Sequence, residues 1–148
     1  MGLKKRNGEL MTRTELENSE TVPKICMVSS PKAAGHITVR YFTPQSAHNS
    51  LAVTGGCCLA TACLLPGTVA HEVAVNLAEF SNEEREIVVD MENPAGILRA
   101  RVCGALSDEG ASIPWAAYAR NTQVFMRGYV PIYTPSKALM KFFSGDAT

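Results

Sequence analysis

The chain has 148 residues, the size of one domain that can bury a sizeable core. Its 14 Lys and Arg residues balance its 14 Asp and Glu residues, so the composition argues against a general nucleic-acid-binding or acidic-membrane-binding protein. The five cysteines, an odd number, predict reduced thiols and a cytoplasmic protein.

The N-terminal third predicts a linker followed by two strands. Residues 1–21 are charged and polar, and their basic start has no apolar segment behind it, so they do not form a secretory signal. Residues 22–30 alternate well enough for a strand, and residues 31–35 form a turn. Residues 36–42 alternate more clearly, with Ile37, Val39 and Tyr41 on the apolar side.

The centre of the chain is an uncharged stretch over residues 51–70. Thr54 has the character of an N-cap and Pro66-Gly67 ends the run, which predicts a helix over residues 55–65. Every face of that helix is apolar or small, so we expect it to be enclosed on all sides. A membrane span needs about 20 apolar residues, and this helix has roughly half of that. Strands of the same chain are therefore expected to enclose it.

The C-terminal half predicts further strands. Residues 68–80 are ambiguous between strand and helix. We expect four strands and a short amphipathic tail, over residues 86–91, 97–106, 113–118, 122–133 and 135–143. About six strands around one apolar helix make an α+β domain in the form of a strand barrel. The expected domain covers residues 22–133, with residues 134–148 as a tail.

Four stretches resemble the PrpF-type proteins and occur in that family's order. They are QSAHNSLAVTGG at residues 45–56, LPGTV at 65–69, NPAGIL at 93–98 and RNTQVFMRG at 120–128. The resemblance covers roughly residues 1–133. PrpF-type proteins include 2-methylaconitate isomerases, aconitate isomerases and oxalomesaconate tautomerases.

The resemblance implies a diaminopimelate-epimerase-like fold of two similar domains, each a strand barrel around a central helix, with the active site between them. This chain resembles the second domain, and its first residues resemble an interior point of a longer chain. The Lys and Cys that act as acid and base in the family belong to the first domain, so the catalytic residues are unknown here. A truncated gene, a split protein and a degenerate copy all stay open. No cofactor or metal is implied, and a separate N-terminal domain or a homodimer is the expected partner.

Candidate substrate-binding residues cluster at the start of the central helix. Thr54, Gly55 and Gly56 can present backbone N–H groups to a carboxylate, because a helix N-terminus favours anions and glycine permits close approach. The alternative is a helix cap with glycines needed for tight packing. His48 and Ser50 precede the helix and could hydrogen-bond the same ligand, although a loop histidine is often only solvated.

Pro94 and Gly96 form a second candidate, since their turn could offer further backbone amides; the alternative is an ordinary hairpin turn. Cys57 could have a lowered pKa in the first helical turn, but core packing is the preferred role for it. The implied function is the C-terminal half of a cofactor-independent isomerase that moves an allylic proton or double bond in an aconitate-like tricarboxylate. The alternative is an inactive remnant or a carboxylate-binding subunit.

Overall fold

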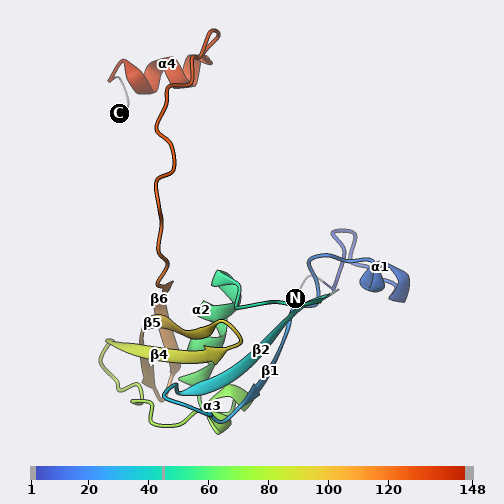
Figure 1. Cartoon of the computed structure of the whole chain (residues 1–148), viewed down its shortest axis with the longest axis vertical. Helices are drawn as coiled ribbons and strands as arrows, with labels where there is room; N and C mark the ends of the chain where they lie inside the picture. The colour runs from blue at the N-terminus through green and yellow to red at the C-terminus, as the bar shows by residue number, and fades with distance from the viewer. Residues whose placement is uncertain (1–2, 45, 146–148) are drawn as a thin grey trace.

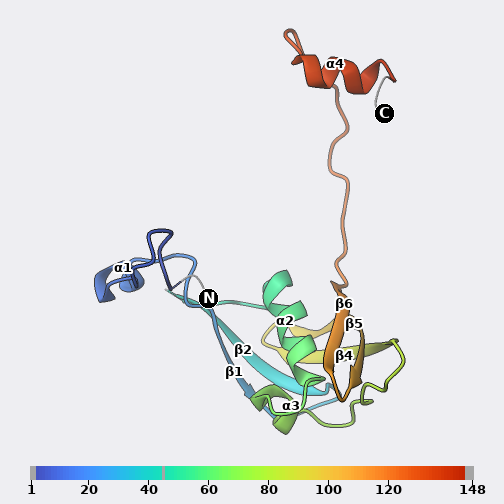
Figure 2. The same ribbon diagram turned by 180° about the vertical axis from the view of Figure 1, so that it is seen from behind.

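Six strands form one mixed sheet in the computed structural model, which describes residues 3–44 and 46–145. The strands are β1 (Ile25–Ser29), β2 (Ile37–Thr43), β3 (Ser46–Ala47), β4 (Arg85–Asn93), β5 (Gly96–Ser107) and β6 (Gly110–Tyr118). Their order is β1-β2-β4-β5-β6, with β3 paired to β2. The β2–β4 pair is parallel and the other pairs are antiparallel. The sheet curves into a half-barrel around one helix (Figures 1 and 2).

The helix inside this curve is α2 (Val53–Cys63), and α3 (Val69–Val73) follows it below the sheet (Figure 1). The core lies between α2 and the inward side chains of three strands. Its largest fully buried members are Ile37, Val39, Leu51, Cys63, Val89, Met91 and Val102. The predicted α+β class and the alternation of residues 36–42 are therefore confirmed. Among the described residues, no helix has the length and apolar character to cross a membrane.

The expected complete enclosure of α2 is wrong. Leu59, Ala60 and Cys63 face the core and are buried, but Val53, Thr54 and Cys58 are exposed. Between β1 and α2 the half-barrel is open, and a groove of about 370 Å³ runs there, lined in part by Cys26, Tyr41, Cys58 and Ala62. An uncharged sequence therefore did not distinguish a helix buried on every side from one with an apolar face left open.

The strand predicted over residues 122–133 is also absent. From residue 119 to 136 the chain runs away from the sheet without secondary structure, and ends in α4 (Lys137–Phe143) (Figure 1). Val124, Phe125 and Met126 are largely exposed. A strand needs a neighbour to satisfy its N–H and C=O groups, and no described segment pairs with this one. The ambiguous residues 68–80 form α3 and then an irregular segment.

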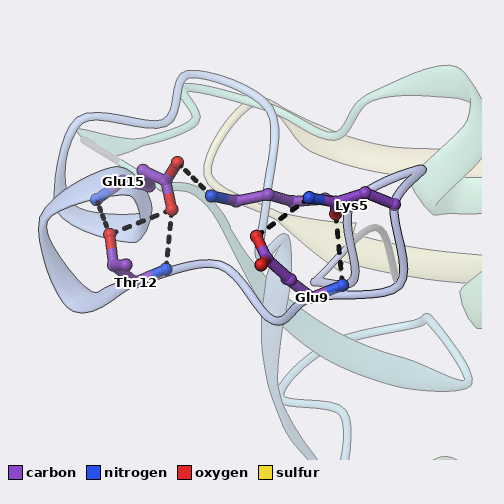
Figure 3. A network of polar contacts seen from close by, with 5 residues as sticks. Lys5, Glu9, Thr12 and Glu15 are labelled. Carbon is purple, nitrogen blue, oxygen red and sulfur yellow. Dashed lines mark hydrogen bonds and ion pairs between the residues drawn. The ribbon is translucent and has the colours of Figure 1, made fainter.

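The polar N-terminal region contains a short helix. Helix α1 (Arg13–Glu17) begins at Thr12 with a capping box, in which Thr12 and Glu15 bond to each other's backbone N–H. Lys5 forms an ion pair with Glu15 at 2.6 Å and donates its backbone N–H to the Glu9 carbonyl (Figure 3). No residue of α1 is buried, so polar contacts hold this region together in place of a core.

Glu92 ties the loop before β2 to the end of β4. Its buried carboxylate accepts hydrogen bonds from the backbone N–H groups of Lys32, Ala33 and Gly35, at 2.7, 2.8 and 2.9 Å. The Thr38 hydroxyl donates a fourth, at 2.7 Å. These bonds hold the pKa of Glu92 at about 2, because each of them favours the charged form. The carboxylate thereby fixes the strand end from which the turn at Pro94 departs.

Candidate functional site

The first turn of α2 has backbone N–H groups that no bond within the helix uses. Its N-cap is Ala52, which has no side-chain cap; Thr54 lies inside the first turn, so the predicted capping role of Thr54 is wrong. The first intrahelical bond runs from the Gly56 N–H to the Ala52 carbonyl at 2.7 Å. The N–H groups of Val53, Thr54 and Gly55 precede it and have no partner within the helix. Val53 and Thr54 are exposed and Gly55 is partly exposed, so this end of the helix, which favours anions, lies at the surface.

Gly55 is in the helix because Tyr41 occupies the space beside it. A Cβ at Gly55 would lie 2.5 Å from Cε2 of Tyr41, closer than any real contact allows. Tyr41 is itself buried, and its ring meets the His48 ring edge-on, with centroids 5.9 Å apart. Gly55 and His48 therefore both contact the ring of Tyr41. Sequence reasoning did not select Tyr41 as a site residue.

The loop of His48 and Ser50 is fixed by local bonds. The Ser50 N–H donates to His48 Nδ1 at 2.9 Å, so in the neutral ring the proton is on Nε2, which is a donor. The His48 N–H donates to the Tyr41 carbonyl at 2.9 Å, and Arg40 donates to the His48 carbonyl at 3.2 Å. His48 can therefore offer one N–H to a ligand while its other ring nitrogen is occupied.

Gly56 makes room for a second aromatic residue. A Cβ there would overlap with Cε2 of Tyr118, the last residue of β6. Sequence reasoning did not select Tyr118. An aromatic residue at the end of the strand expected over residues 113–118 could have pointed to it. The alternative that both glycines are needed for packing is therefore supported. The N–H groups at the exposed start of the helix can still bind a ligand.

Pro94 and Gly96 lie apart from this turn in the β4–β5 hairpin. Asn93 closes the hairpin: its Oδ1 accepts the Ala95 N–H at 2.9 Å and its Nδ2 donates to the Gly96 carbonyl at 2.8 Å. Gly96 has a φ of 118°, which explains the glycine. Since Pro94 has no N–H and that of Ala95 is occupied, the turn offers fewer amides than expected.

No single described pocket holds both predicted groups. Thr54 and Gly55 line the groove of about 370 Å³, which also contacts Lys24. Pro94 lines a different cavity of about 440 Å³, with Lys32 and Arg40. Binding of one ligand by both groups stays a prediction.

Burial disfavours the thiolate form at two cysteines of α2, Cys57 and Cys63. Burial, with a smaller contribution from Cys58, raises the pKa of Cys57. Its Sγ lies 3.8 Å from the Ala116 carbonyl. Cys63 is buried, and burial raises its pKa to about 12. Packing is therefore the supported role of Cys57 and Cys63, and within the described residues no group of three or more His, Cys, Asp or Glu is placed to hold a metal ion.

Comparison with known proteins finds one family and several relatives. The family model described as PrpF protein matches residues 2–134. The "(4E)-oxalomesaconate Delta-isomerase" of Novosphingobium sp. (strain KA1) is 34% identical over 123 residues, which are 83% of this chain and 32% of that protein. The "4-oxalomesaconate tautomerase" of Pseudomonas putida is 37% identical over 79 residues, 53% of this chain and 20% of that protein.

A solved structure, that of a methylitaconate-delta-isomerase, aligns with a TM-score of 0.49 and 21% identity, covering 73% of this chain and 32% of the other. This chain spans about a third of the length of the Novosphingobium relative.

Proposed function

This chain belongs to the PrpF family, and from that premise we propose that it is the carboxylate-anchoring, C-terminal part of a cofactor-independent isomerase. The reaction moves an allylic proton or double bond in an unsaturated tricarboxylate of the aconitate type. Both relatives are named for the isomerisation or tautomerisation of oxalomesaconate. The half-barrel is taken as one half of a diaminopimelate-epimerase-like fold, with a separate N-terminal domain completing the site.

The observation that carries the proposal is the uncapped, solvent-open first turn of α2. Three N–H groups without helical partners point out of the helix end there, and the helix dipole favours negative charge at that end. His48, whose ring meets Tyr41 edge-on and whose Nδ1 accepts the Ser50 N–H, can add a donor from Nε2. Donors without a nearby base suit anchoring of a carboxylate better than proton transfer.

A second candidate is a carboxylate-binding subunit or inactive remnant that keeps the anchor without the chemistry. Burial raises the pKa of Cys57, which favours this candidate for the chain on its own. The two candidates differ in what happens when the remaining part of a relative is supplied. Turnover would then appear for the first and binding alone would persist for the second.

Binding is tested by titrating cis-aconitate into the chain and following the backbone amide signals of Val53, Thr54 and Gly55 by NMR. The informative variant is Val53→Pro, which deletes one N–H at the first helical position. The backbone accepts it, because Ala52 already has the extended conformation (φ −67°, ψ 143°) that precedes proline. We expect Val53→Pro to weaken binding several-fold.

The matched control is Val69→Pro, at the first position of α3, where Thr68 is equally extended (ψ 147°). It should leave cis-aconitate binding unchanged. Loss of affinity in both variants, or in neither, would contradict an anchor at α2.

A further inference from the structure

Tyr118 has a buried hydroxyl without a hydrogen-bond partner among the described residues, and it alone among their buried side-chain polar atoms is in that state. A buried hydroxyl that makes no hydrogen bond costs free energy, so each such group in a folded protein asks for an explanation. A ligand that arrives at the site can supply the missing partner.

The phenol lies against the N-terminal half of α2. Its Cε2 occupies the space that a side chain at Gly56 would need, and Leu51 lies on the same side of that glycine. The Gly56 N–H makes the first bond of the helix, so the ring adjoins the turn whose earlier N–H groups are free. The Tyr118 ring thus lies beside the helix end at which the proposed function places a carboxylate.

A cation lies over the ring of Tyr118. The guanidinium carbon of Arg120 lies 5.9 Å from the centre of the Tyr118 ring. Arg120 is exposed, and no described carboxylate forms an ion pair with it. Burial raises the pKa of Tyr118 and Arg120 lowers it in part, so the phenol is protonated at neutral pH and acts as a donor.

We propose that Tyr118 is a substrate-binding residue, whose O–H donates to the carboxylate held at the first turn of α2 while Arg120 pairs with the charge of the same group. The inference rests on the proposed function and adds to it two residues from the end of β6. It also explains why position 56 is glycine: the ring could not lie beside the helix otherwise.

The test compares Tyr118→Phe with the wild type in two measurements. Without ligand, Tyr118→Phe should keep or raise the Tm, because the variant removes a buried group that has no partner. With cis-aconitate followed by calorimetry, the same variant should raise Kd about 10-fold, in line with a hydrogen bond to a charged group. A purely structural tyrosine would not raise the Tm and weaken binding together.

Arg120→Gln serves as a second variant with little risk to folding, since its side chain is exposed; we expect a several-fold increase in Kd. The matched controls are Tyr129→Phe and Arg127→Gln, both on the exposed segment beyond β6. They should change neither quantity. Unchanged affinity in Tyr118→Phe with a binding wild type overturns the role of Tyr118 and leaves the proposed function standing. A wild type that does not bind cis-aconitate overturns both.

Discussion

The backbone of Gly55 lies directly against the buried ring of Tyr41, where an added Cβ would be 2.5 Å from Cε2 and 3.0 Å from the hydroxyl oxygen. This contact joins the first turn of α2 to β2. The His48 ring meets the same Tyr41 ring edge-on, with centroids 5.9 Å apart. The anchor therefore depends on a glycine that is required by packing.

Gly55→Ala should destabilise the protein by about 1–2 kcal/mol, because the buried Tyr41 ring must shift and the gain in helix propensity offsets only part of that cost. Urea unfolding measures the change. Gly128→Ala is the control, since a Cβ there meets no atom within 4 Å. Equal stabilities of the two variants would show that Tyr41 moves freely.

Two alanines of α2 provide a test of where the half-barrel is open. Ala60 is completely buried, and Ala62 lines the groove beside β1. Ala60→Leu should cost about 1–3 kcal/mol through overpacking, whereas Ala62→Leu should stay within about 0.5 kcal/mol. Both changes have nearly the same helix propensity, so the difference in unfolding free energy reports packing. A large cost at Ala62 would mean that the groove closes in solution.

The sequence predicted those elements whose signal is local. The alternation of Ile37, Val39 and Tyr41 identified β2, and the capping box of Thr12 and Glu15 could have identified α1. The strand predicted over residues 122–133 was wrong, because a strand also needs a partner and the local sequence does not supply one. Gly55 and Gly56 were selected for approach to a ligand, but the rings that require them come from distant strands. Such contacts between segments far apart in sequence cannot be read from one chain.

Glu92 predicts a specific dependence of stability on pH. Its pKa in the folded protein is about 2, against an ordinary value of 4.5. The contribution of the carboxylate is therefore fully present above about pH 4.5 and is lost as the pH falls toward 2. In Glu92→Gln the unfolding free energy should be lower at pH 7 and should fall less between pH 5 and pH 3.

Urea unfolding at several pH values measures this difference, with Glu84→Gln as an exposed control that should follow the wild type. If the unfolding free energies of the wild type and Glu92→Gln changed with pH by the same amount, the role of these four hydrogen bonds would be contradicted.

The exposed segment beyond β6 predicts self-association. Phe125 is 89% exposed and Tyr129 is fully exposed, and apolar groups gathered on a surface favour binding to another one. We expect a dimer or poor solubility. Sedimentation should show an average molecular mass that rises with protein concentration. Replacing Phe125 and Tyr129 together by Glu should reduce association without changing unfolding of the half-barrel. The control replaces Asn121 and Thr122 by Glu, which adds the same charge at polar positions and should have little effect on association. If this control reduces association equally, added charge and not the loss of apolar contact explains the effect.

The last prediction concerns turnover, and it follows from the state of the groups near the anchor. Moving an allylic proton requires a base, and a well-placed acid or base contributes about 10²–10⁴-fold to the rate. The Nδ1 atom of His48 already accepts the Ser50 N–H, and burial raises the pKa of Cys57 above its ordinary value. The chain alone should therefore isomerise cis-aconitate at least about 100-fold more slowly than a whole relative measured beside it. His48→Gln should raise the KM for cis-aconitate but leave the residual rate at saturating substrate unchanged, because the ring is assigned to binding and not to proton removal. Adding, as a separate polypeptide, the part of the Novosphingobium relative that this chain does not match should restore turnover. If the chain alone reaches the rate of the whole relative, a base is present in it, and Cys57→Ser becomes the variant that decides where.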